Sequence, residues 1–170
     1  MRSRRLVGLT ILGTALLILA LAAPAAAGST TYTFALVGPN IAVAPSGQHA
    51  GDTIRVTGSG TFDPAAGTVA AGGSFTHFNA DGTVHQRGTW QATSLTSFGG
   101  FGGPSPGRQG GVLWLVVTHF HNGEAPHPGI PMSVTSTINA PPGLIEGTTV
   151  GEFTVKTAGK ARFHLTSLYR

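Results

Sequence analysis

The chain contains no cysteine among its 170 residues, and only 9% of its residues are charged. Without cysteine it can form no disulfide scaffold and carry no thioester-linked lipid, so burial of apolar side chains has to stabilise it. It also lacks an N-x-[ST] glycosylation sequon. The glycine-rich residues 99–111 lack the lysine and hydroxyl that end a phosphate-binding loop.

One apparent catalytic motif is excluded on chemical grounds. Residues 103–107 read Gly-Pro-Ser-Pro-Gly and match the G-x-S-x-G pattern of serine hydrolases. In that fold the backbone N–H after the serine stabilises the oxyanion, but here the following residue is Pro106, which has no N–H. We therefore expect no serine-hydrolase site at Ser105.

The first 27 residues have the three parts of a cleavable secretory signal. Arg2, Arg4 and Arg5 precede the apolar stretch 6–23, and Pro24 is followed by small residues 25–27. An uncleaved membrane anchor and a twin-arginine export signal are the alternatives. We predict a protein that is secreted, extracellular or in the cell envelope, with no membrane association after cleavage.

Cleavage would leave 170 − 27 = 143 residues, which suits one domain at 28–170. Three of the ten basic residues leave with the signal, so seven basic and six acidic residues remain, with a net charge of +1. Such a balance gives no reason to expect a nucleic-acid partner.

Hydrophobic alternation with a period of two, interrupted by glycine and proline, predicts an all-β domain. Long, glycine-containing strands in succession favour a small antiparallel meander that closes into a barrel. The alternative is a two-sheet sandwich, because residues 112–117 are apolar on both faces. Residues 99–111 are predicted to be a flexible loop. Strands are expected at 31–37, 52–62, 68–78, 83–96, 111–120, 132–139, 150–156 and 160–168.

A repeat of the form G-T-V-x3-G-[ST]-aromatic, offset by 15 residues, links the strands at 68–78 and 83–96. A two-residue Asp81-Gly82 turn would pair Phe75 with Gly88, Gly73 with Trp90 and His77 with Gln86. Each inward aromatic ring would then cover a glycine. This register places His85 outward, away from His77. The predicted core includes Phe75, Trp90, Trp114, Phe153 and Phe163, and His164 is expected at the surface.

The best metal-binding candidate is His119-Phe120-His121 with Glu124 and His127 downstream. Residues two apart on a strand point to the same side, so two imidazoles and a carboxylate could converge on a divalent metal. The order H-x-H followed by glutamate resembles the first motif of the cupin family. It departs from that motif in its short gap to Glu124, its upstream glycine spacing and the absence of a second motif, so no family is assigned.

A second candidate is a ligand-binding site at His77, Gln86 and Trp90, facing the interior of the sheet. A mutually hydrogen-bonded polar pair is the plainer interpretation of His77 and Gln86. The function predicted from sequence is a non-catalytic binding or cell-envelope module for a small apolar or neutral ligand, or for a surface partner. No cofactor is expected on this interpretation. The alternative is a metal-dependent, cupin-like enzyme that uses the His-x-His and glutamate residues.

Overall fold

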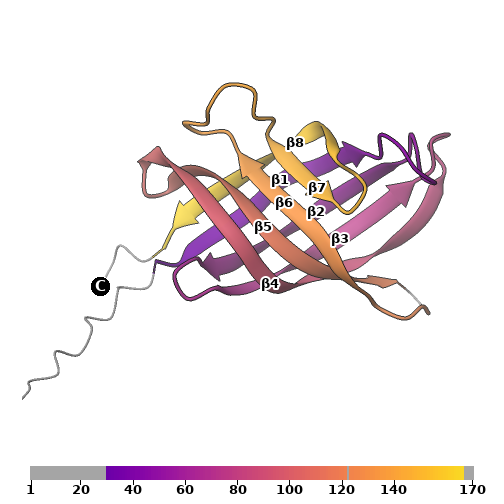
Figure 1. The fold of residues 1–170 in the computed structure, drawn as a ribbon, viewed down its shortest axis with the longest axis horizontal. Helices are drawn as coiled ribbons and strands as arrows, with labels where there is room; N and C mark the ends of the chain where they lie inside the picture. Colours follow the sequence, from indigo (N-terminus) through magenta and orange to yellow (C-terminus); the bar gives the residue numbers. More distant parts are fainter. Residues whose placement is uncertain (1–29, 122, 167–170) are drawn as a thin grey trace, which may run out of the picture.

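The eight strands in the described part of the chain belong to one antiparallel sheet (Figure 1). This computed structural model describes residues 30–121 and 123–166. The predicted signal, residues 1–27, lies outside the described residues. The strands are β1 Tyr32–Val43, β2 Thr53–Asp63, β3 Thr68–Phe78, β4 Val84–Ser105, β5 Arg108–His121, β6 His127–Ser136, β7 Gly147–Val150 and β8 Val155–Leu165.

Six of the strands form a closed ring of hydrogen-bonded neighbours in the order β1, β2, β3, β4, β5, β8. The ring closes where Gln109 of β5 pairs with Phe163 of β8. Beyond that point β5 pairs with β6, and β6 pairs with β7. The all-β prediction is confirmed. The alternative of two separate sheets is wrong for the described residues, because the hydrogen bonding is continuous across all eight strands.

The core lies inside this curved sheet and contains one residue in two from most strands. Leu113, Leu115 and Val117 of β5 are at most 1% exposed. An aromatic cluster fills the end of the ring where β1 begins and β8 ends, made of Tyr32, Phe34, Phe62, Phe98 and Phe163. Of the predicted core, Phe75, Trp90, Phe153 and Phe163 are buried.

The prediction for Trp114 is wrong, because its side chain is 46% exposed. Leu113 and Leu115 on either side of it point into the core, so the strict alternation of a strand turns Trp114 outward. Because residues 112–117 are apolar on both faces, the sequence predicts that both faces of this strand are buried. In the structure the inner face is buried, and the outer face is exposed at Trp114.

The β3–β4 hairpin has the predicted register through most of its length. Gly73 pairs with Trp90, Phe75 with Gly88 and His77 with Gln86. An added Cβ at Gly88 would lie 3.0 Å from the Phe75 ring, which confirms that an aromatic ring covers this glycine.

The turn of this hairpin is longer than the two residues predicted. Asn79 N–H donates to the Thr83 carbonyl at 2.8 Å, which leaves three residues between them. Gly82 has φ +85°, a value that glycine adopts easily. The extra residue is compensated by an irregularity next to His77, where Phe78 pairs with Val84.

The flexible loop predicted at 99–111 is instead most of a hairpin. Gly99 pairs with Val112, Gly100 with Gly111 and Gly102 with Gly110, so β4 and β5 continue almost to the tip. A Cβ at Gly110 would lie 1.7 Å from the Ile138 carbonyl oxygen, and one at Gly111 would lie 2.6 Å from the Phe98 ring. Neighbouring groups pack so closely against Gly110 and Gly111 that no side chain would fit at either position. A glycine-rich composition does not show whether the glycines serve such close packing or make a loop flexible.

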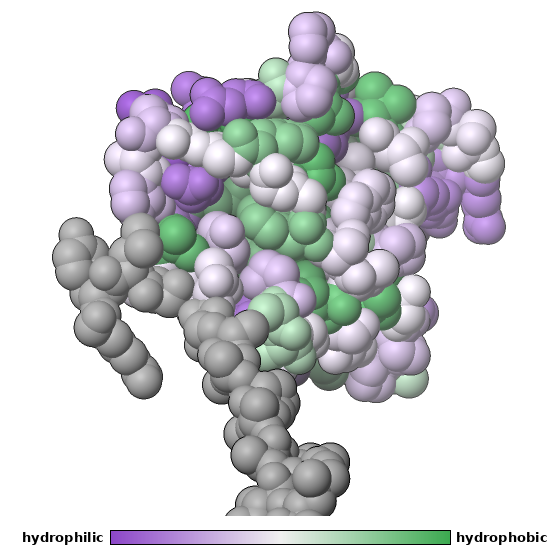
Figure 2. Space-filling model, turned by 60° about the vertical axis from the view of Figure 1, so that its left-hand side comes forward, coloured by the Kyte–Doolittle hydropathy of each residue, from purple (hydrophilic) through white to green (hydrophobic). Residues whose placement is uncertain are grey.

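Apolar and polar residues are intermingled on the face of the molecule shown in Figure 2. The large hydrophobic side chains with the most exposure are Val84, Trp114, Phe120, Leu144, Ile145 and Val155. Among the described residues there is no helix of the length and hydrophobicity needed to cross a bilayer.

Candidate functional site

Four chain connections meet at one end of the sheet, opposite the aromatic cluster. In an antiparallel sheet with sequential strands, the connections that follow odd-numbered strands all lie at the same end (Figure 1). These are the β1–β2, β3–β4, β5–β6 and β7–β8 connections. Residues of the β1–β2 and β7–β8 connections, together with strand residues near this end, line a pocket of about 300 Å³.

Histidine is the dominant polar residue of this pocket, which we call the histidine pocket. Six of the seven histidines of the chain line it: His49, His77, His85, His119, His121 and His127. Its apolar lining comes from Ile54, Phe75, Ile130, Val150 and Phe153. The seventh histidine, His164, is exposed on β8 as predicted.

One wall of the histidine pocket is a hydrogen-bonded group formed by His49, Asp52 and His77. The Oδ2 atom of Asp52 lies 2.8 Å from Nε2 of His77 and 3.1 Å from Nδ1 of His49. Asp52 and His77 are each 7% exposed. The predicted pairing of His77 with Gln86 by hydrogen bonding is therefore wrong, since the partner of the imidazole is Asp52.

His85 also belongs to this wall, which corrects the expectation that it points away from His77. The two ring centres are 4.5 Å apart. The cause is the irregularity in the β3–β4 ladder, where His77 pairs with Gln86 and the next pair is Phe78 with Val84. His85 is thus the extra residue of a β-bulge, and a bulge sets two consecutive residues opposite a single partner.

Burial and hydrogen bonding set the charges in this wall. Burial raises the pKa of Asp52, but hydrogen bonds from His77 and His49 outweigh it and hold that pKa below its usual value. Burial lowers the pKa of His77, despite the opposing effect of its bond to Asp52. A carboxylate beside neutral imidazole is therefore the state favoured near neutral pH.

The β5–β6 hairpin also contributes to the lining of the pocket, and it contains the residues predicted to bind metal. Ligand atoms of His121, Glu124 and His127 all lie within 4.8 Å of one another. Nε2 of His127 is 3.8 Å from Oε2 of Glu124, and Gln86 donates to the same oxygen at 3.2 Å. Three of the four predicted ligands are thus brought together.

The fourth predicted ligand, His119, lines the pocket but is not in that group. Its ring stacks on Phe75 with centres 4.3 Å apart, and it is 8% exposed. Burial, reinforced by His121 and His127, lowers its pKa to about 4. Burial also lowers the pKa of His121. Both rings are therefore neutral at pH 7, the form in which an imidazole binds a metal.

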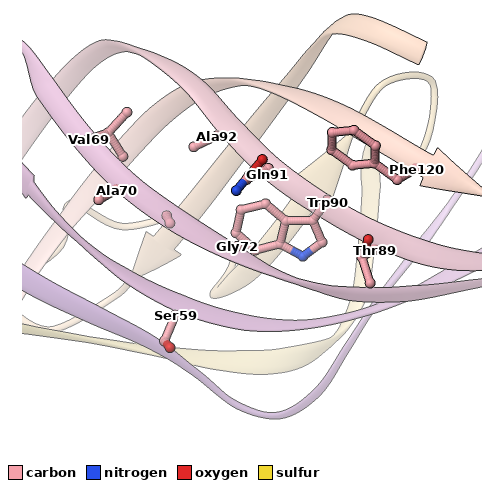
Figure 3. Close-up of a pocket in the computed structure, with 10 residues that line it drawn as sticks. Ser59, Val69, Ala70, Gly72, Thr89, Trp90, Gln91, Ala92 and Phe120 are labelled. Atoms are coloured by element: carbon pink, nitrogen blue, oxygen red, sulfur yellow. The ribbon is translucent and has the colours of Figure 1, made fainter. Parts of the chain in front are cut away.

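Trp90 does not share a pocket with His77 and Gln86. Its indole is 3% exposed, and Nε1 donates to the Thr57 carbonyl at 2.9 Å. Figure 3 shows Trp90 instead at a shallow hollow, beside Gly72, Thr89 and Phe120. The set predicted to bind a ligand is therefore divided: His77 and Gln86 lie in the histidine pocket, and Trp90 packs against β2.

Sequence reasoning missed His49, Asp52 and Glu152. His49 and Asp52 lie in the turn-rich β1–β2 connection, and Glu152 lies two residues after the end of β7. The only local signal was the spacing of a histidine three residues before an aspartate. These residues come close to the pocket only because their connections lie at the same end of the sheet. Their place in the site is therefore set by the sheet topology and not by a local sequence pattern.

Two donor sets of the same composition therefore lie at the histidine pocket, each with two imidazoles that line the pocket and one carboxylate beside them. One is His49, Asp52 and His77, and the other is His121, Glu124 and His127. This composition suits Zn²⁺, Fe²⁺ and similar divalent transition metals, and it leaves coordination positions for water or another ligand.

Comparison of the chain with protein-family models, with curated proteins and with solved structures found no match in any of the three.

Proposed function

We propose that this protein is an exported binding module that holds a divalent transition-metal ion in the histidine pocket. The ligands of this first site are His121, Glu124 and His127. The observation that carries the proposal is the gathering of six of the seven histidines around one pocket. The distance between the ring centres of His121 and His127 is 5.0 Å, close to the value of about 5 Å expected for two imidazoles on one tetrahedral ion.

The surroundings of the first site support this assignment. Nδ1 of His121 is buried and has no hydrogen-bond partner among the described residues. A buried polar atom without a partner destabilises the fold, and a bound ligand would supply that partner. Gln86 donates to Glu124 at 3.2 Å and so orients the carboxylate from the neighbouring strand. Such outer contacts are typical of metal ligands.

A metal is favoured over the apolar or neutral ligand predicted from sequence. The interior of the ring is filled by its own side chains, with Phe62, Leu113 and Phe163 at most 1% exposed. The space that accepts a ligand is the pocket at the end, and its polar lining is made of six imidazoles, the Gln86 amide and the Glu152 carboxylate.

We further propose that the ring of strands acts as a small β-barrel with one closed and one open end. The aromatic cluster packs the end near the start of β1, and the histidine pocket opens at the other. Export through the leader at residues 1–27 would place that opening in the extracellular or envelope space. An enzyme that used the same ligands would also need the metal, so the proposal concerns binding and assigns no reaction.

The test is a zinc titration of the full-length protein produced without a histidine tag. Isothermal titration calorimetry with ZnCl₂ should show saturable binding to the wild type, and Glu124→Gln should weaken it at this site by at least about 100-fold, more than loss of an outer contact. His164→Gln is the matched control, because it removes the one histidine outside the pocket. Wild-type binding in Glu124→Gln, or equal losses in Glu124→Gln and His164→Gln, would contradict the proposal.

A further inference from the structure

We infer that His49, Asp52 and His77 form a second divalent-metal site at the histidine pocket, separate from the first site. Ligand atoms of the three residues lie within 4.8 Å of one another. None of them belongs to the first site, so the two sites can be tested independently. The sequence did not predict this site, because His49 and Asp52 lie in the β1–β2 connection and His77 lies on β3.

The spacing of the two imidazoles fits a shared ion. The ring centres of His49 and His77 are 5.1 Å apart, again close to the value of about 5 Å expected around a tetrahedral zinc. Asp52 lies between them, with one oxygen near a nitrogen of each ring. The atoms that would bind the ion are therefore Nδ1 of His49, Nε2 of His77 and the carboxylate of Asp52.

This donor set is held in place before any ion arrives. Asp52 and His77 are buried, and the backbone around Asp52 is fixed by hydrogen bonds from Asp52 N–H to the His49 carbonyl at 2.9 Å and from Ala44 N–H to the Asp52 carbonyl at 3.0 Å. His77 also contacts the ring of Phe153 edge-on, at 5.0 Å between centres. Side chains that are already fixed lose little conformational entropy when an ion binds, so binding costs less free energy.

Glu152 supplies the kind of outer contact that metal-binding histidines usually have. Its Oε1 lies 3.9 Å from Nε2 of His49, the ring nitrogen that faces away from Asp52. A small side-chain movement would let His49 donate an Nε2 proton to Glu152, leaving Nδ1 deprotonated for the ion.

Metal binding at this site exchanges hydrogen bonds for coordination bonds. Without metal, Asp52 accepts hydrogen bonds from Nδ1 of His49 and Nε2 of His77. With metal, the same two nitrogens coordinate the ion, and each ring carries its single proton on its other nitrogen. The exchange therefore changes the tautomer of each ring.

The plainer interpretation is that His49, Asp52 and His77 form a hydrogen-bonded cluster that only stabilises the β1–β2 connection. A zinc titration of the tag-free protein distinguishes this structural cluster from a metal site. We expect two equivalents of Zn²⁺ per chain, and we expect Asp52→Asn to remove one of them while the other binds as in the wild type. Asp63→Asn is the matched control, because Asp63 caps a turn at the other end of β2 and accepts from Ala65 and Ala66 N–H.

The variants distinguish failure of this site from failure of the proposed function. A single equivalent that Glu124→Gln removes and Asp52→Asn does not would overturn the second site and leave the first. A single equivalent that only Asp52→Asn removes would establish the second site and refute the first. Glu152→Gln should weaken the second site by about 10- to 100-fold.

Asp52→Asn could disturb folding, so a measurement on the wild type decides the matter if that variant loses its circular-dichroism spectrum. In long-range ¹⁵N–¹H NMR spectra, Zn²⁺ should shift the Nδ1 resonance of His49 and the Nε2 resonance of His77, with the protons moving to the opposite nitrogens. Unchanged resonances of both rings at saturating Zn²⁺ would overturn the second site.

Discussion

The indole of Trp90 occupies the space in which a side chain at Gly58 would lie. A β-carbon added to Gly58 would be 2.4 Å from Cζ2 of Trp90 and 2.6 Å from the Gly72 carbonyl oxygen. Trp90 is fixed there by its hydrogen bond to Thr57. Trp90 of β4 can therefore pack in this position only because Gly58 of β2, two strands away, has no side chain.

This relationship predicts that Gly58→Ala lowers the free energy of unfolding by about 3 kcal/mol or more, because backbone and indole both have to move. Urea denaturation measures the change. Gly99→Ala is the matched control, since a β-carbon there meets nothing within 4 Å, and its effect should stay below about 1 kcal/mol. Similar losses in the two variants would argue against the placement of Trp90.

The two tryptophans should differ in fluorescence, because Trp90 is 3% exposed and Trp114 is 46% exposed. Trp114→Phe leaves the buried indole and should give blue-shifted emission that acrylamide quenches poorly. Trp90→Phe leaves the exposed indole and should give red-shifted, readily quenched emission. Equal quenching of the two variants would contradict the inward and outward assignment of these side chains.

Burial of His119 predicts that the metal-free protein loses stability as the pH is lowered. Its folded pKa is about 4 against an ordinary value of 6.5, so between these values the unfolded chain binds a proton that the folded protein does not. The stability contributed by the neutral ring is therefore complete above pH 6.5 and declines towards pH 4, by on the order of 3 kcal/mol.

His119→Phe keeps a ring against Phe75 and removes this titration. In the presence of a chelator, urea denaturation at several pH values between 7 and 4 should show a shallower decline for the variant than for the wild type. Parallel declines would mean that His119 is not buried in its neutral form.

A buried amide links β1 to β8 and β7. Asn40 is 1% exposed, donates to the Lys160 and Gly38 carbonyls at 3.3 Å each, and lies 3.5 Å from the Thr148 hydroxyl. Asn40→Ala should cost about 2 to 3 kcal/mol, because buried carbonyls lose their donor and a small cavity forms. Thermal or urea unfolding checks this, with exposed Gln91→Ala as the control. A loss of stability no larger than that of Gln91→Ala would contradict the burial and hydrogen bonding of Asn40.

Local pattern was sufficient to predict that strands fill the domain, the bounds of some of them and the register of one hairpin. It placed others incorrectly: a strand expected at 150–156 is β7, Gly147–Val150, and one expected at 132–139 is β6, His127–Ser136. The expected bounds of β3, 68–78, agree with the structure, since alternation and flanking turn residues both mark them. The pairs Phe75 with Gly88 and Gly73 with Trp90 followed from matching inward faces. In contrast, the bulge at His85 has no clear signature, and it alone turns this histidine towards His77.

The candidate site could be predicted only where its residues are neighbours in sequence. His121, Glu124 and His127 are close in sequence around one turn, so the sequence could propose that they share a site. Strand alternation also added His119, which the structure does not bring into that group. His49 and His77 are separated by β2, and Glu152 is 75 residues after His77 in the chain. These residues meet because every second connection lies at the same end of the sheet, and the sequence did not specify how that end closes.

The most direct test of metal binding in the histidine pocket is anomalous diffraction at the zinc absorption edge, from crystals of the tag-free protein grown with Zn²⁺. The account predicts a strong anomalous peak between His121, Glu124 and His127, with bonds of about 2 Å to the imidazole nitrogens. A well-ordered pocket with no anomalous peak, or zinc found only at surface residues outside it, would contradict the account.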